Sequence, residues 1–278
     1  MMAELDWPVR HGGAAVVTPG GAERQWVAGT QEDRVWAVAS VTKLLTGMAA
    51  LAAVEAGHVE LDRPVDPEGA TLRHLLAHAS GLPMTLGQGR RRAVGQRRVY
   101  SNAGFRVAAE VVADAVGTSF PMWLSSSVLD PLGMGSTRLA RHEEFDEDPA
   151  AGALTTMDDL VAFARCLLGG GAPVLGAELF AEATTVQFPG LAGLVPGVGR
   201  YDPCDWGLGF ELLDGKRPHW MGERRSPVSY GHFGASGCFL WVDPAAEIAA
   251  VGLSDRPFEE DRWAMGTWPA WSDGLPAA

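Results

Sequence analysis

The chain has 278 residues, of which 47% are hydrophobic and 20% charged, and its formal net charge is −12 at pH 7. A chain of this length and composition can bury a substantial core, and disorder over most of its length is excluded. The negative charge repels the phosphate backbone of nucleic acids, so we expect no nucleic-acid partner.

The first six residues lack both the basic start and the apolar stretch of a secretory signal, so we expect a cytoplasmic protein. The longest apolar run, residues 44–54, is far shorter than the roughly 20 residues needed to cross a bilayer, and we expect no membrane partner. Three cysteines, Cys166, Cys204 and Cys238, lack Cys-x-x-Cys spacing. This predicts reduced thiols, and neither a disulfide framework nor a zinc site.

The N-terminal part of the chain predicts a β-hairpin, with strands at residues 13–17 and 24–28 on either side of a Thr-Pro-Gly-Gly turn. A strand over residues 35–39 leads into Ser40. Residues 41–56 are apolar on nearly every face and end at Gly57, which predicts a buried helix. The middle of the chain predicts four more helices, over residues 71–77, 104–116 and 119–129, and from a cap at Thr155 or Thr156 to Gly169.

Strand patterns return near the C-terminus, over residues 207–212, 231–242 and 247–254, and a final helix is predicted over 259–271. Strands at both ends around a helical middle predict an α+β fold, in which one antiparallel sheet formed from both termini is flanked by helices. We expect a single domain over residues 1–278. Within it we expect an α/β lobe over about 1–60 and 185–278, and an inserted, mainly helical lobe over about 61–184.

The rarest residue types in the chain gather in two short motifs. There are only two lysines and one asparagine, and one of those lysines and that asparagine lie in Ser40-Val41-Thr42-Lys43 and Tyr100-Ser101-Asn102. Arginine carries almost all other basic charge, yet only lysine can lose its proton and act as a base near neutral pH. Since Lys43 lies one helical turn after Ser40, the spacing places its amine beside the hydroxyl. An ordinary helix cap would explain Ser40 but not a buried lysine, so the motif predicts an activated serine nucleophile.

Together with His232-Phe233-Gly234, these motifs resemble the three motifs of the class C β-lactamase and penicillin-binding-protein superfamily: Ser-x-x-Lys, Tyr-x-Asn, and Lys or His followed by x-Gly. Further segments resemble that superfamily in the same order along nearly the whole chain: Leu75-Leu76-Ala77-His78-Ala79-Ser80-Gly81-Leu82-Pro83, Asp130-Pro131-Leu132-Gly133-Met134, Trp206-Gly207-Leu208-Gly209 and Leu240-Trp241-Val242-Asp243-Pro244. The resemblance implies a β-lactamase/transpeptidase-like fold and a serine hydrolase that works through an acyl-enzyme.

The resemblance also implies a role for each motif residue. Ser40 would attack an acyl carbonyl, while Lys43 and Tyr100 would remove its proton and deliver it to the leaving group. Asn102 would position the substrate and Lys43. The backbone N–H groups of Ser40 and Ala235 would form the oxyanion hole. The implied partner is a small-molecule ester or amide, and neither a cofactor nor a metal is implied.

His232 departs from the lysine that β-lactamases and penicillin-binding proteins usually carry to meet a substrate carboxylate, and histidine is frequent in the esterase branches. A histidine is mostly neutral at pH 7 and holds a carboxylate less firmly. We therefore expect a carboxylesterase acting on small or medium esters. The alternatives are a β-lactamase, a D-alanyl carboxypeptidase or D-amidase, an acyltransferase, or, from another class, a catalytically silent binding or sensor protein. Gly234 is expected to leave room for a substrate along the strand.

Three other groups have weaker signals. His232 and Cys238 lie about 20 Å apart if one strand carries both, which would exclude a Cys–His pair. His74 and His78 are four residues apart, like a metal pair, but no glutamate follows His74 and we favour a packing role. The basic run contains Arg90, Arg91, Arg92, Arg97 and Arg98. It is either a solvated loop or a rim that attracts anionic acyl groups.

Overall fold

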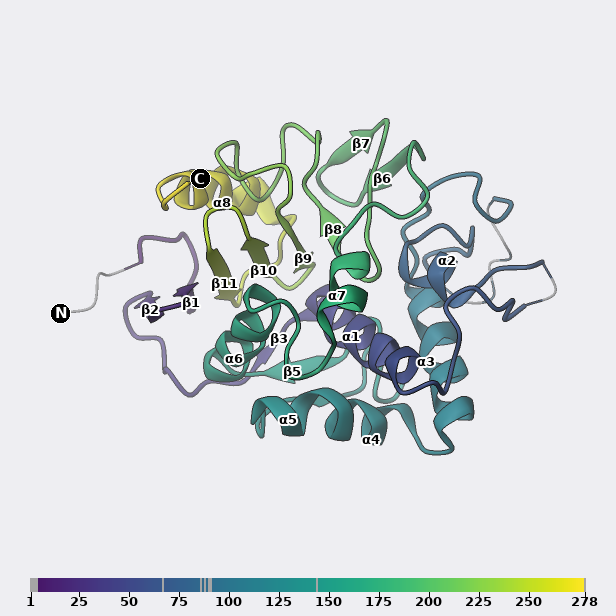
Figure 1. The fold of residues 1–278 in the computed structure, drawn as a ribbon. Helices are drawn as coiled ribbons and strands as arrows, with labels where there is room; N and C mark the ends of the chain where they lie inside the picture. The colour runs from purple at the N-terminus through teal and green to yellow at the C-terminus, as the bar shows by residue number, and fades with distance from the viewer. Residues whose placement is uncertain are drawn as a thin grey trace.

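The computed structural model describes residues 5–66, 68–85, 87, 89, 92–143 and 145–277. Its main sheet has six antiparallel strands in the order β2-β1-β11-β10-β9-β8 (Figure 1). The two N-terminal strands, β1 (Gly12–Thr18) and β2 (Gly21–Trp26), lie beside strands from the C-terminal part: β8 (Glu211–Leu212), β9 (Tyr230–Gly234), β10 (Cys238–Asp243) and β11 (Ile248–Ser254). The α+β fold with a sheet built from both termini is confirmed.

Two hydrophobic cores cover the two faces of this sheet. On one face, Leu240 and Val251 pack in a core with helices α1 (Thr42–Glu55) and α6 (Met157–Leu168). On the other face, Phe239 and Trp241 pack in a second core with α8 (Trp263–Asp273). Alternate residues of β10 therefore enter different cores, as the two-residue period of a strand requires.

Helix α1 runs through the centre of the molecule (Figure 1). Its residues from Thr42 to Ala53 are all buried, as the apolar pattern predicts. The helix ends before Gly57, whose φ of +77° is a conformation that glycine adopts without a steric penalty. Because α1 is held on all sides, its first turn is a rigid support for Ser40.

The remaining elements surround α1 and the sheet. The helices are α2 (Leu72–Leu76), α3 (Asn102–Val116), α4 (Phe120–Leu124), which continues through the π-turn η2 (Ser125–Leu129) into α5 (Asp130–Leu132), and α7 (Ala177–Ala183). Two small sheets join β3 (Trp36–Ala37) to β5 (Ala153–Thr155) and β4 (Arg138–Leu139), and β6 (Gly193–Val195) to β7 (Gly199–Tyr201). Two 3₁₀ turns, η1 (Ala39–Val41) and η3 (Glu260–Arg262), precede α1 and α8. No helix among the described residues is long and apolar enough to span a membrane.

The prediction of one strand over residues 231–242 is wrong, because the chain turns back after Gly234 and forms the hairpin β9–β10. Gly237 makes this turn possible: its φ is +87°, and a Cβ there would lie 2.0 Å from the carbonyl oxygen of Arg256. Three other predictions need adjustment. Helix α3 begins at Asn102, the strand predicted over 207–212 is only the two residues of β8, and the helix predicted to stop at 129 continues to Leu132. Helix α7 and the β6–β7 hairpin were not predicted.

Candidate active site

The serine of the first motif follows a strained turn. Ala39, the residue before it, has a φ of +44°, which is rare for a residue with a side chain. Ser40 then lies in η1, directly before α1 and beside β9. The strained turn brings the Ser40 hydroxyl to the wall of a pocket at the positive end of a buried helix.

Lys43 is fully buried and its amine is held by three hydrogen bonds. In its ammonium form, Nζ donates to Ser40 Oγ (3.1 Å), to Asn102 Oδ1 (2.7 Å) and to the carbonyl oxygen of Ala150 (2.9 Å). The structure thus brings Lys43 to Ser40, as their spacing predicts, and brings Asn102 to Lys43, as the resemblance implies. Their catalytic roles are taken up below as proposals.

Burial lowers the pKa of Lys43 from 10.5 to about 7. The carboxylate of Asp148 opposes this shift and the guanidinium of Arg106 adds to it. Asp148 and Arg106 form a buried ion pair, with Nε–Oδ1 and Nη2–Oδ2 distances of 3.0 and 2.9 Å. A neutral amine is therefore available at neutral pH within hydrogen-bond distance of Ser40.

Tyr100 and Asn102 are positioned by the start of α3. Ser101 between them is buried and caps the helix, since its Oγ accepts from the Gly104 N–H (2.8 Å) and donates to the Pro83 carbonyl (2.6 Å). Asn102 is the first residue of the helix. The Tyr100 ring lies 4.9 Å from Lys43 Nζ, and burial raises the pKa of its hydroxyl, while a hydrogen bond with Ser40 opposes that rise.

The tautomer of His232 follows from its hydrogen bonds. Nδ1 lies 2.6 Å from the Phe233 carbonyl oxygen, which can only accept, so Nδ1 carries the proton. Nε2 is then an acceptor, and it lies 3.5 Å from the Tyr100 hydroxyl. Burial, followed by the charge of Lys43, lowers the pKa of His232 to about 3. His232 is therefore neutral at pH 7.

Gly234 and Ala235 lie where β9 passes the turn before Ser40. A Cβ on Gly234 would lie 2.2 Å from the Val38 carbonyl oxygen. The glycine is thus required by the close approach of two backbone segments, and this contact, rather than the substrate path we expected, gives its physical reason. Within the described part of the chain, no hydrogen bond uses the Ala235 N–H. This donor borders the same pocket as Ser40.

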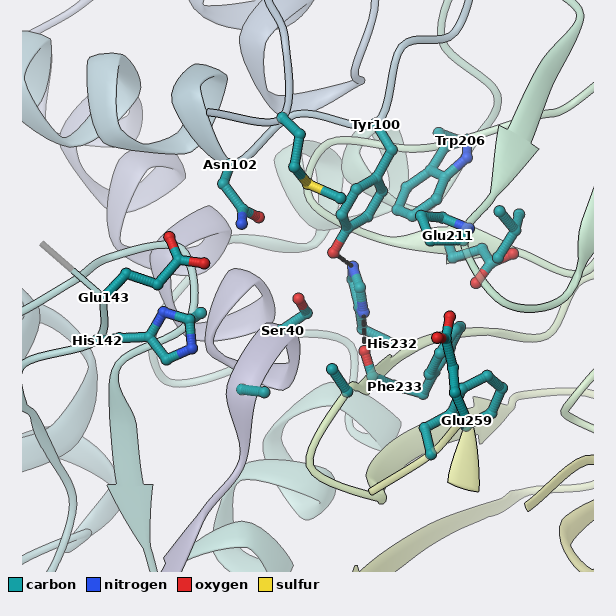
Figure 2. A pocket seen from close by; sticks show the side chains of 17 residues that line it. Ser40, Tyr100, Asn102, His142, Glu143, Trp206, Glu211, His232, Phe233 and Glu259 are labelled. Carbon is teal, nitrogen blue, oxygen red and sulfur yellow. Dashed lines mark hydrogen bonds between the residues drawn. The ribbon is translucent and has the colours of Figure 1, made fainter. Parts of the chain in front are cut away.

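The pocket that contains Ser40 has a volume of about 300 Å³. Figure 2 shows Ser40 with Asn102 above it to the left and with Tyr100 and His232, which contact each other, to its right. Most of the wall is apolar, but three carboxylates also line it: Glu143, Glu211 and Glu259. Glu143 and Glu259 are exposed at the mouth of the pocket.

Sequence reasoning missed these three glutamates. Glu211 is fully buried, and burial, which raises its pKa, is outweighed by His219, Lys216 and Trp220, so that its pKa falls to about 2. Lys216, the second lysine of the chain, lies 3.5 Å from Glu211 and donates to the carbonyl oxygen of Asp205 (2.7 Å). The rarity of lysine is a sequence signal that could have identified Lys216. No sequence signal identifies Glu143 and Glu259, because they lie outside any motif.

The weaker candidates take structural positions. His78 Nδ1 accepts from the Ser101 N–H (3.1 Å), and His74 Nδ1 lies 2.8 Å from the hydroxyl of Thr71 in the cap of α2. In the part of the chain that the structure describes, no three His, Cys, Asp or Glu residues are grouped to hold a metal.

The 20 Å separation of His232 and Cys238 does not hold, because the hairpin places Cys238 opposite Gly234. Burial nevertheless raises the pKa of the Cys238 thiol to about 11. A protonated thiol is a poor nucleophile.

Comparison with known proteins gives consistent results. A family model described as Beta-lactamase matches residues 4–270. A crystal structure of a beta-lactamase from Mycobacterium bovis is 47% identical, with a TM-score of 0.89 over 96% of this chain and 94% of that chain. A mutant of simvastatin synthase (LovD) from Aspergillus terreus is 17% identical, with a TM-score of 0.74 over 96% and 91% of the two chains, which shows the fold alone. Penicillin-binding protein 4* from Bacillus subtilis is 27% identical over 139 residues, and the match spans 31% of its length.

Proposed function

Because the chain belongs to the beta-lactamase family of serine hydrolases, we propose that it acts on small or medium uncharged esters, as a carboxylesterase with an acyl-enzyme on Ser40. The observation that carries this choice is the charge of the pocket. His232 is neutral, and the carboxylates of Glu143 and Glu259 lie at the mouth. A carboxylate placed next to the scissile bond would be repelled there, whereas an uncharged ester would not.

In the first half of the proposed reaction, neutral Lys43 accepts the Ser40 proton as Oγ attacks the ester carbonyl. The N–H groups of Ser40 and Ala235 stabilise the oxyanion that forms. The carbon–oxygen bond to the alcohol then breaks, and the leaving oxygen takes a proton from the Tyr100 hydroxyl, which Lys43 restores. The acyl group remains on Ser40.

In the second half, water attacks the acyl-enzyme and gives its proton to the neutral amine of Lys43. The tetrahedral intermediate collapses, Ser40 Oγ takes that proton from Lys43, and the carboxylic acid leaves. Asn102 supports both halves because its Oδ1 fixes the Lys43 amine (2.7 Å).

β-Lactam hydrolysis is the second candidate, and the 47% identity with a protein described as a beta-lactamase favours it. The two candidates differ in whether the substrate carries a carboxylate close to the scissile bond. Acyl transfer to an alcohol uses the same acyl-enzyme and differs only in the second acceptor.

The deciding experiment compares p-nitrophenyl butyrate with nitrocefin, a β-lactam that carries a carboxylate. We expect kcat/KM to be higher for the butyrate and to fall at least about 10³-fold in Ser40→Ala. Ser126→Ala, which removes an exposed hydroxyl on η2, is the matched control and should keep the wild-type rate. A higher kcat/KM for nitrocefin would favour the second candidate, and equal rates for wild type and Ser40→Ala would remove Ser40 as the nucleophile.

A further inference from the structure

A basic groove adjoins the catalytic pocket. It has a volume of about 470 Å³ and is lined by Arg92, Arg97 and Arg200, with apolar side chains between them. Arg92 and Arg97 come from the basic run before Tyr100, while Arg200 comes from β7, a hundred residues further along the chain. Arg90 and Arg91 lie outside the described residues. The fold therefore gathers cations from two separate segments of a chain whose net charge is −12.

The groove shares part of its wall with the pocket around Ser40. Three residues, Met84, Tyr100 and Pro196, line both. Met84 and the groove residue Leu194 are 41% and 45% exposed, so both offer apolar surface to a bound acyl chain. An acyl chain bound at Ser40 can leave the pocket over Met84 and Pro196 and reach the arginines.

The arginines of the groove differ from Arg98, which also lines it. Arg98 is buried and donates to the carbonyl oxygens of Ala77 (2.7 Å) and Cys204 (3.0 Å), so its guanidinium holds the loops together. Arg97 and Arg200 form no side-chain hydrogen bond or ion pair with any residue that the structure describes. The planar guanidinium fork matches carboxylate and phosphate oxygens.

We propose that this groove binds an anionic group, a carboxylate or a phosphate, at the end of the substrate remote from the scissile ester. The assignment rests on the proposed esterase function. It also explains the charges at the catalytic pocket, since Glu143 and Glu259 repel the anion from the mouth while Arg97 and Arg200 attract it to the groove. A substrate with one charged end is thereby oriented before reaction.

The kinetic test uses p-nitrophenyl monoesters of linear dicarboxylic acids from succinate to sebacate, each paired with its methyl-capped diester. For acyl chains long enough to reach the groove, we expect kcat/KM to be about tenfold higher for the ester with a free carboxylate than for its methyl-capped partner. This ratio should fall several-fold in Arg97→Ala and Arg200→Ala and at high salt, because each removes or screens a cation. Arg165→Ala on α6, an exposed arginine outside both cavities, should leave the ratio unchanged.

A binding measurement separates failure of this proposal from failure of the esterase. Calorimetric titration of Ser40→Ala with monomethyl suberate and with dimethyl suberate compares the affinities of an anionic and an uncharged ligand, and it needs no turnover. A third titration, with a ligand that ends in a phosphate monoester, shows whether the groove prefers a phosphate or a carboxylate. Tighter binding of an anionic ligand that is lost in Ser40→Ala/Arg200→Ala supports the groove even if wild type hydrolyses no ester. Equal rates and equal affinities for anionic and capped ligands would overturn it.

Discussion

The pKa of Lys43 is open to a direct kinetic test. If neutral Lys43 is the base, kcat/KM for p-nitrophenyl butyrate must fall as the amine becomes protonated, with an acid limb at the pKa of about 7. Two pH units below it, about 1% of the amine is neutral, so we expect kcat/KM at pH 5 to be about 100-fold below the plateau. The assay covers pH 5 to 8.5, with initial rates corrected for spontaneous hydrolysis.

Three variants show which residue causes the acid limb of the pH profile. Lys43→Arg cannot supply a neutral base and should lose at least about 10³-fold in rate. His232 has a pKa of about 3 and cannot produce an acid limb near neutral pH. His232→Gln should therefore show the same limb, even where its plateau kcat/KM is lower than that of wild type. His142 also lines the pocket, and His142→Gln controls for its imidazole. A rate that stays flat between pH 5 and 8, or a limb that disappears with either histidine, would refute Lys43 as the base.

The same shift affects stability. The folded pKa of Lys43 is about 7 and its ordinary value is 10.5, so the unfolded chain binds more protons between these values and stability rises with pH in that window. The difference, 10.5 − 7, is about 3.5 units, or roughly 5 kcal/mol in total. From pH 8 to pH 10, urea unfolding should show wild type gaining about 2.5 kcal/mol relative to Lys43→Met, which lacks the titrating group. Parallel pH profiles of the two proteins would contradict the shift.

Three further substitutions have defined outcomes. Gly234→Ala places a Cβ against the Val38 carbonyl oxygen and should cost about 1–3 kcal/mol in thermal unfolding and at least about 100-fold in kcat. Tyr100→Phe should lower kcat about 10²- to 10⁴-fold for an alkyl ester, whose leaving oxygen needs a proton, and less for a p-nitrophenyl ester; equal losses would argue against proton delivery by Tyr100. Lys216→Met leaves the Glu211 carboxylate without its cation and should destabilise the protein by about 3–5 kcal/mol, whereas an unchanged melting temperature would show that the ion pair is dispensable.

Local sequence patterns predicted the parts of the site that lie within one element. Lys43 lies within hydrogen-bond distance of Ser40 because both belong to one helical turn, and the buried helix was visible in its apolar pattern. The β9–β10 turn was missed although Gly234-Ala235-Ser236-Gly237 carries a hairpin signal in its glycines. The reason for Gly234 was also out of reach, since it depends on contact with Val38, about two hundred residues earlier.

The charges around the pocket could not be predicted because they come from loops whose partners are set by the tertiary fold. Glu259 precedes η3 and Arg200 lies on β7, and neither belongs to a motif. The sequence does not show which charged side chains lie near one another in the folded protein. A rare residue type, in contrast, can be recognised in the sequence and indicates a position where no other residue serves.

The two lysines show how much can be inferred from the rarity of a residue type. Both are fully or almost fully buried, although lysine is rarely buried without a partner. In the proposed mechanism Lys43 must release its proton to act, which arginine cannot do. Lys216 has another reason to be lysine: its ammonium is a compact charge that donates to the backbone carbonyls of Asp205 and Leu212 and pairs with Glu211, next to the ring of Trp206. A guanidinium is larger and needs a planar arrangement of acceptors. The rarity of lysine thus pointed to Lys43 before the fold was known, whereas the place of Lys216 behind the pocket wall became visible only when the fold brought it beside Glu211.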